Sequence, residues 1–248
     1  MIFKPDALDA AIIDLDGTLV DTMGDFVVAI NRMLSDLSLP ALGREVIEPL
    51  VGKGSEHLIR SVLDHVSNRP SAHAGQGVTA INSGAKEGMD ATADGRFPAA
   101  WASYQRHYLA VNGQHAAVYP GVMAGLQHLK ARGLKLACLT NKPLAFAVPL
   151  LKAKELDGFF SVVFGGDSFE RKKPDPLPLL KTCEALGSVP ARTLMIGDSS
   201  NDARAARAAG CPVWLVTYGY NHGEPVRGVD ADGFTDTLAE LPLAPASP

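Results

Sequence analysis

The sequence is poor in cysteine. Its 248 residues include three, Cys138, Cys183 and Cys211, which are widely spaced and lie in apolar surroundings. An odd number without short spacings argues against a disulfide framework and against a cysteine-based metal site. We therefore expect three buried thiols and a protein that works in a reducing compartment, the cytoplasm.

Long apolar runs and an excess of basic charge are also missing. No run of about 18 consecutive apolar residues occurs, so no membrane span is expected. Residues 1–9 carry one lysine and two aspartates and lack the features of a signal peptide. Lysine and arginine total 23 against 27 acidic residues, a net charge of −4, which gives no reason to expect nucleic-acid binding. A small anionic substrate would need local positive charge.

The chain does contain short apolar segments that alternate with amphipathic ones. Strands are predicted at residues 10–13, 134–139, 162–164, 193–196 and 213–216, and helices at 122–132, 144–153, 177–186 and 202–209. Asp175 is expected to cap a helix that begins at Pro176 and ends before Gly187. Apolar strands separated by helices are typical of a parallel sheet covered on both faces. The sequence therefore predicts an α/β fold with a Rossmann-like core.

The first predicted strand is separated from the others by roughly a hundred mostly helical residues. We therefore predict a helical cap, residues 21–115, inserted into a core made of residues 1–20 and 116–248. Within the cap, residues 67–95 are rich in Ala, Gly, Ser and Asn and are interpreted as a mobile insertion. The aromatic stripe that follows, Trp101, Tyr104 and Tyr108, is expected to form cap core.

Polar side chains follow four of the predicted strands directly. They are Asp14, the pair Thr140 and Asn141, residues 165–167, and the pair Gly197 and Asp198. In open α/β sheets ligands bind outside the carboxyl ends of the strands, so these residues point to one crevice. Each turn alone is equally well explained by residues that cap the next helix, but the four together with Lys173 favour a site.

Asp14 and Asp16 lie just beyond the end of the first strand, where the backbone can curl and let both converge. Hydrolysis of a phosphate monoester is among the slowest uncatalysed reactions, so several groups must act together. Asp14 is predicted to be the nucleophile that forms an aspartyl-phosphate. Asp16 is predicted to protonate the leaving alkoxide and then to take a proton from the attacking water.

A carboxylate that attacks an anionic phosphoryl group needs positive charge around it. Mg²⁺ held by Asp14, Asp198 and the backbone carbonyl of Asp16 would supply part of that charge, because hard cations prefer oxygen ligands. Lys173, in the basic segment 171–176, is predicted to bind the phosphate. The alternative is that this segment is a solvated loop before a helix.

Five further residues are candidates for supporting roles. Thr140 and Asn141 can donate to phosphate oxygens, unless they only cap the helix that follows. Asp202 can orient the lysine or a metal-bound water, or it can serve as a first-turn acid of its helix. Lys53 and Gly54 are expected in a lid loop of the cap that touches the non-phosphate end of the substrate.

Four segments together resemble the motifs of the haloacid dehalogenase superfamily of phosphohydrolases. They are residues 14–18 (DLDGT), Thr140 with Asn141, Lys173 with Pro174, and Gly197 and Asp198 with Asp202. The resemblance spans the whole predicted core in order and spacing. It implies a Rossmann-like core, a helical cap after the first strand, Mg²⁺ dependence, and the roles argued above.

Residues 19–22, 51–54, 119–121 and 172–174 further resemble one group of that superfamily, the bacterial phosphoglycolate phosphatases. This implies that a small phosphorylated metabolite, 2-phosphoglycolate, is hydrolysed to glycolate. A β-phosphoglucomutase-like phosphomutase, or a phosphatase of another sugar phosphate or a nucleotide, stays open as an alternative. A receiver-like signalling module is disfavoured because it needs no helical insertion after the first strand.

Overall fold

A six-stranded parallel sheet forms the centre of the protein. The computed structural model describes residues 8–68 and 91–242. Within them the strands run in the order β5-β4-β1-β6-β7-β8, each parallel to its neighbours. Their bounds are β1 Ala10–Ile13, β4 Lys135–Leu139, β5 Val162–Phe164, β6 Thr193–Gly197, β7 Val213–Val216 and β8 Gly233–Thr235.

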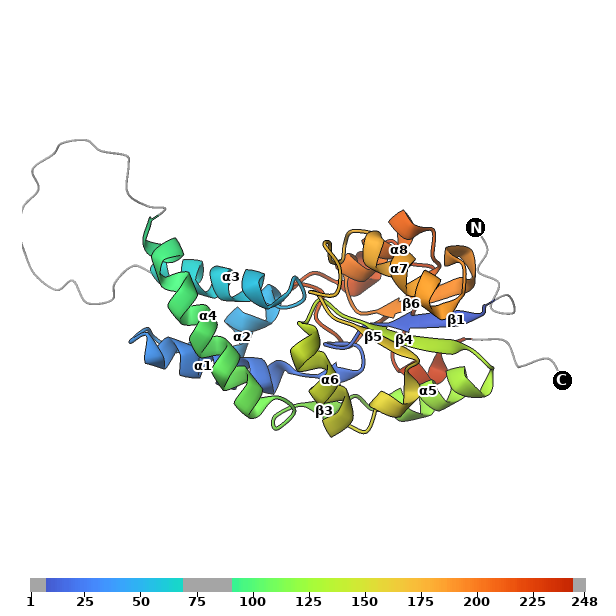
Figure 1. Cartoon of the computed structure of the whole chain (residues 1–248), viewed down its shortest axis with the longest axis horizontal. Helices are drawn as coiled ribbons and strands as arrows, with labels where there is room; N and C mark the ends of the chain where they lie inside the picture. Colours follow the sequence, from blue (N-terminus) through green and yellow to red (C-terminus); the bar gives the residue numbers. More distant parts are fainter. Residues whose placement is uncertain (1–7, 69–90, 243–248) are drawn as a thin grey trace, which may run out of the picture.

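Helices cover both faces of this sheet (Figure 1). Along β1, Ala11 and Ile13 pack into one hydrophobic cluster, and Ala10 and Ile12 pack into another, because successive side chains of a strand point to opposite faces. The first cluster includes α5 Val122–Ala131 and α6 Leu144–Ala153, and the second includes α7 Leu177–Leu186 and α8 Ser200–Ala209. The prediction of a Rossmann-like parallel core is confirmed.

The helical cap lies beside the core and has a hydrophobic cluster of its own (Figure 1). Its elements are α1 Met23–Asp36, α2 Arg44–Ile47, the 3-10 helix η2 Glu48–Leu50, α3 Ser55–Ser67 and α4 Ala91–Val111. Tyr104 and Tyr108 are fully buried in this cluster and Trp101 packs against it. The aromatic stripe is therefore cap core, as expected.

Two short strands join the cap to the core. Strand β2, Val20–Asp21, pairs antiparallel with β3, Ala117–Val118, so the chain leaves the core and returns to it along one two-stranded ribbon. Sequence analysis did not predict these strands or β8, because β2 and β3 have only two residues each and β8, Gly233–Thr235, contains a single large apolar residue, Phe234. No described helix has the length and apolar content of a membrane span, while the cytoplasmic location stays a prediction.

Two local expectations need correction. Helix α7 spans Leu177–Leu186, as predicted, but its N-cap residue is Pro176 rather than Asp175, whose carboxylate accepts a hydrogen bond of 2.9 Å from the Leu177 amide. The Asp175 carboxylate therefore satisfies a backbone N–H at the helix start from the residue that precedes the N-cap. In the predicted insertion, residues 91–95 form the first turn of α4, whereas residues 69–90 lie outside the described part of the chain.

Candidate active site

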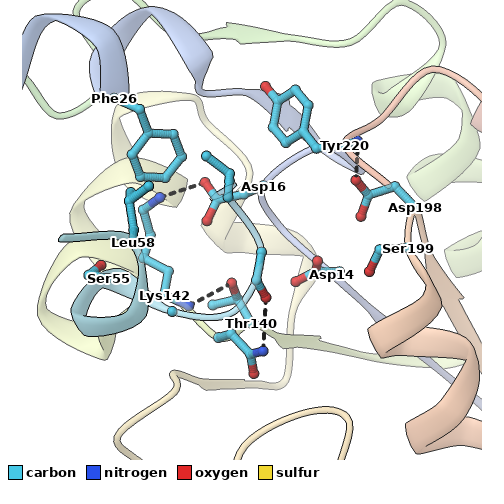
Figure 2. Close-up of a pocket in the computed structure, with 14 residues that line it drawn as sticks. Asp14, Asp16, Phe26, Ser55, Leu58, Thr140, Lys142, Asp198, Ser199 and Tyr220 are labelled. Carbon is cyan, nitrogen blue, oxygen red and sulfur yellow. Dashed lines mark hydrogen bonds and ion pairs between the residues drawn. The ribbon is translucent and has the colours of Figure 1, made fainter. Parts of the chain in front are cut away.

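A glycine turn places the two acids of the first motif. Asp14 follows β1, and its amide donates to the carbonyl of Ile196 in β6, at 2.9 Å. Gly17 adopts a φ of +84°, and a Cβ there would lie 2.1 Å from a carboxylate oxygen of Asp198. Only glycine fits such a conformation and so close an approach. As a result Asp14 and Asp16 both face the same cavity at the carboxyl ends of the strands (Figure 2).

Lys173 is a buried ammonium group held between two carboxylates. Its Nζ lies 2.9 Å from Asp14 Oδ1 and 2.7 Å from Asp202 Oδ1, and it donates to the carbonyl of Leu139 at 2.8 Å. Burial pulls the pKa of Lys173 down, but Asp14 and Asp202 outweigh it and raise that pKa above its ordinary value. Lys173 therefore carries a fixed positive charge beside Asp14 rather than lying in a solvated loop.

Three buried carboxylates converge beside this lysine. One oxygen from each of Asp14, Asp198 and Asp202 lies within 4.8 Å of the others. Burial raises the pKa of Asp14 to about 7, an effect that Lys173 opposes and Asp202 reinforces. Burial, followed by repulsion from Asp202 and Asp14, raises the pKa of Asp198 well above its ordinary value. Burial and mutual repulsion thus disfavour the ionised forms of Asp14 and Asp198, as expected of acids that need a cation beside them.

Asp202 has both of its oxygens committed. Oδ1 is paired with Lys173, and Oδ2 accepts from the hydroxyl of Ser199 at 2.8 Å and from the amides of Ser199 and Asp198. Asp202 thereby completes a capping box at the start of α8. The structure therefore places it in both positions considered from the sequence, as a helix-capping acid and as the partner of Lys173.

The donor set fits a divalent cation. Around the cavity the carboxylates of Asp14, Asp16, Asp198 and Asp202 face two ammonium groups, those of Lys142 and Lys173. When all four carboxylates are ionised, the excess of two negative charges equals the charge of one Mg²⁺ ion, and oxygen ligands suit that ion. Asp14 and Asp198 line the cavity, whereas Asp202 lies outside its lining and caps α8, so Asp14 and Asp198 are the side chains suited to hold it.

Lys142 lines the cavity and was not among the residues predicted from the sequence. Its side chain is buried, and its Nζ lies 2.5 Å from Asp16 Oδ1, which also accepts from the Thr22 hydroxyl at 2.7 Å. The ammonium lies over the rings of Phe26 and Tyr108, at 4.6 and 5.0 Å from their centroids. Its position directly after the strand-end pair of the second motif was the signal that could have revealed it.

The two polar residues of the second motif have different surroundings. Thr140 lines the cavity, and its hydroxyl accepts from the amide of Lys142 at 3.1 Å. The side-chain amide of Asn141 is occupied: it donates to the carbonyls of Lys173 and Gly52, at 2.8 and 3.0 Å, and accepts from the Lys173 amide. Asn141 thus joins the Lys173 loop and a cap loop and also lines the cavity, while its role toward the phosphate stays a prediction.

The cap closes one side of the cavity with small and apolar groups. The cavity holds about 470 Å³ of free space, part of it open to solvent. Gly54 lies on its wall, whereas Lys53 is exposed and outside the lining, so the predicted substrate contact of Lys53 has no support in this structure. The cap contributes these lining residues: Phe26, Val51, Gly52, Gly54, Ser55 and Leu58.

Tyr220, in the loop after β7, was also missed. Its amide donates to Asp198 Oδ2 at 2.5 Å, and its hydroxyl contacts Asp21 and accepts from the amides of Thr22 and Met23 at 3.0 and 3.2 Å. It therefore fixes the orientation of Asp198 and the start of the cap together. A lone tyrosine in a loop gave no sequence signal for this role.

Comparison with known proteins gives consistent results. Residues 8–210 match the family model of the haloacid dehalogenase-like hydrolases. Phosphoglycolate phosphatases from Thiobacillus denitrificans and Cupriavidus necator are 43% and 41% identical, over 96% of this chain and 96% and 94% of theirs. The crystal structure of a predicted phosphoglycolate phosphatase from Haemophilus somnus superposes with a TM-score of 0.82 at 31% identity, covering 94% of this chain and 96% of that one.

Proposed function

Because this chain belongs to the haloacid dehalogenase-like hydrolase family, we propose that it is a Mg²⁺-dependent phosphatase that converts 2-phosphoglycolate into glycolate and phosphate. It is a phosphoric monoester hydrolase, as the family and the named relatives show. The observation that carries the proposal is the buried cluster of Asp14, Asp198 and Lys173, in which a nucleophilic carboxylate lies beside a fixed ammonium group.

In the proposed reaction an oxygen of Asp14 attacks the phosphorus atom of the ester. A new O–P bond forms to Asp14 while the bond from phosphorus to the alkoxide oxygen breaks, and Asp16 gives its proton to that oxygen. Asp16 then takes a proton from water, which attacks the aspartyl-phosphate and releases inorganic phosphate and free Asp14. One residue thus serves as acid and then as base, and the chain returns to its starting state.

The positive charge that this reaction needs comes from fixed groups. Lys173 lies 2.9 Å from the nucleophile and so faces the phosphoryl oxygens as they approach. The hydroxyl of Thr140 lies on the same wall of the cavity and can donate to a phosphoryl oxygen. Mg²⁺ held by Asp14, Asp198 and the Asp16 carbonyl would offset the repulsion between carboxylate and phosphate when bound.

The location of the cavity and the names of the relatives support a small substrate. It lies between the strand ends and the cap, so a molecule bound there can be shielded from bulk water. Relatives that share more than 40% of their residues with this chain carry the name phosphoglycolate phosphatase. Together these observations favour 2-phosphoglycolate over a larger sugar phosphate or a nucleotide.

We also propose that residues 21–115 act as the cap and residues 1–20 and 116–248 as the core. The hydrophobic cluster of the helices before β3, to which the core adds Phe146 and Tyr220, supports this division. The ribbon of β2 and β3 also supports this division, because the chain passes from the core to the cap along β2 and returns along β3. Limited proteolysis of the β2–β3 crossings, followed by separation under native conditions, tests these boundaries.

The experiment that tests the function is a phosphate-release assay on a panel of phosphorylated metabolites, with Mg²⁺ and with a chelator in its place. The highest kcat/KM is expected for 2-phosphoglycolate, and the chelator should abolish release from every ester. The panel includes β-glucose 1-phosphate, with glucose 6-phosphate measured as a product. Conversion of that sugar phosphate without phosphate release would instead show a phosphomutase.

A further inference from the structure

We propose that Lys142 is the specificity-determining residue that recognises the carboxylate of the substrate. The proposal rests on the function proposed above and deepens it, because it assigns a partner to the non-phosphate end of the molecule. It also replaces Lys53, whose exposed side chain lies outside the cavity lining.

Lys142 is built into the cavity as a fixed charge. It lines the cavity with only 2% of its side chain exposed, and Asp16 and the rings of Phe26 and Tyr108 surround its ammonium group. An ammonium group has three N–H donors. Within the described residues one donor is directed at Asp16, while the rings cover another side. The ammonium group of Lys142 can therefore still donate a hydrogen bond to a second acceptor.

The covalent structure of 2-phosphoglycolate places its carboxylate near the ammonium group of Lys142. For the leaving oxygen to be protonated it must lie next to Asp16, and in 2-phosphoglycolate the carboxyl carbon is two bonds from that oxygen. In Figure 2 Phe26 and the ammonium of Lys142 lie to one side of Asp16, and Asp14 and Asp198 lie to the other. A phosphoryl group at Asp14 thus directs a short acidic tail toward Lys142.

The other lysines near the cavity are less suited to the task. Lys173 already pairs with Asp14 and Asp202, and it lies where the phosphoryl group must bind. Lys172 is exposed and lies outside the cavity lining, although its Nζ is near Gly54. A carboxylate that is withdrawn from water needs a buried cationic partner, because an unpaired buried charge is costly. Lys142 offers that partner.

The test compares two esters of matching length, 2-phosphoglycolate and ethyl phosphate, whose tail carries no charge. In Lys142→Met the kcat/KM for 2-phosphoglycolate should fall roughly 30-fold or more beyond any fall for ethyl phosphate, the range expected for a lost charged hydrogen bond. Most of this extra loss should be in KM, because the tail is bound equally before and during the reaction. The control Lys172→Met should leave the ratio of the two kcat/KM values unchanged.

A second variant separates recognition from support of Asp16. Lys142→Arg keeps the positive charge, so it should retain most of the preference for the acidic ester even if the turnover of both esters drops. Equal losses on both esters in Lys142→Met and Lys142→Arg would overturn the proposal and leave Lys142 as a positioning residue for Asp16. If wild-type protein shows no preference for 2-phosphoglycolate over ethyl phosphate, the proposed function itself fails.

Discussion

The two halves of the site differ in how they are built. On the core side, charged groups at strand ends are locked by buried partners, as Lys173 is between Asp14 and Asp202. On the cap side, residues 51–58 offer small and apolar groups and attach to the core through the carbonyl of Gly52, which accepts from two core asparagine amides. The groups that perform the chemistry are therefore in the rigid half, and the cap supplies enclosure.

This difference predicts that substitutions on the two sides will fail in different ways. Core substitutions remove a reacting group or leave a buried charge unpaired, and both effects are large. Substitutions of exposed cap side chains change only solvated surface and should have small effects. The predictions below test this contrast.

The largest effect is expected at the nucleophile. Asp14→Asn replaces a nucleophilic carboxylate with an amide, so kcat should fall by about 10⁴-fold or more on every ester. Asp16→Asn should differ on p-nitrophenyl phosphate, whose leaving group needs no proton. There the aspartyl-phosphate should form and persist, which stopped-flow absorbance would show as a burst of about one nitrophenolate per site.

A cooperative thermal melt with a midpoint above the assay temperature serves as the folding control for each variant. A burst in Asp14→Asn, or the same steady slow rate without a burst in both variants, would contradict the division of roles between Asp14 and Asp16.

A smaller but still large effect is expected at Asp202. Asp202→Asn removes one charged partner of buried Lys173 and weakens the capping box, so the free energy of unfolding should fall by about 2 to 4 kcal/mol. Asp175→Asn is the matched control: it alters a helix-start carboxylate without a buried lysine, and about 1 kcal/mol or less is expected. Urea unfolding of the two variants measures the difference. Similar losses would show that Asp202 acts as a cap alone.

The core side of the site followed from the sequence for a simple reason. Carboxyl ends of parallel strands meet at one edge, so an acid after one strand and an acid after another must come close once the sheet is recognised. Asp14 and Asp198 are 184 positions apart in the chain and meet for this reason. The strands are revealed by near-continuous apolar runs that alternate with amphipathic helical segments.

The cap side did not follow from the sequence in the same way. Which residue of the 51–54 loop faces the cavity depends on the path of that loop and on how the cap rests on the core. The sequence therefore could not show that Lys53 is exposed and lies outside the cavity lining. Lys142 was missed because its ion pair with Asp16 and its contacts with Phe26 and Tyr108 join segments that are far apart in the chain.

A moderate effect is expected when pH and metal are varied together. Because burial raises the pKa of Asp14 from 3.8 to about 7 in the metal-free fold, the folded protein holds a proton there that the unfolded chain has lost. Stability without metal should therefore fall as pH rises through that window. Mg²⁺ binds the deprotonated site, so it should raise the melting temperature more at about pH 8 than at about pH 6. Equal shifts at both pH values would contradict this assignment.

The smallest effect is expected for the exposed cap lysine. Lys53→Ala should change kcat/KM for 2-phosphoglycolate by less than about two-fold, because a solvated charge outside the cavity contributes little. Lys142→Ala measured in parallel provides the contrast. A large rise in KM for Lys53→Ala with the acidic ester alone would show that the cap loop moves its lysine to the substrate, and the two halves would then share recognition.

The claim at the centre of this account is that Asp14 and Asp198 hold one divalent cation beside Lys173. Isothermal titration of the substrate-free protein with MgCl₂ at slightly alkaline pH tests it without reference to turnover, with Asp167→Asn as a control at another strand end. We predict one Mg²⁺ bound per chain by wild type and by the control, and binding weakened by about 10-fold or more in Asp198→Asn. Unchanged binding in Asp198→Asn would contradict the account.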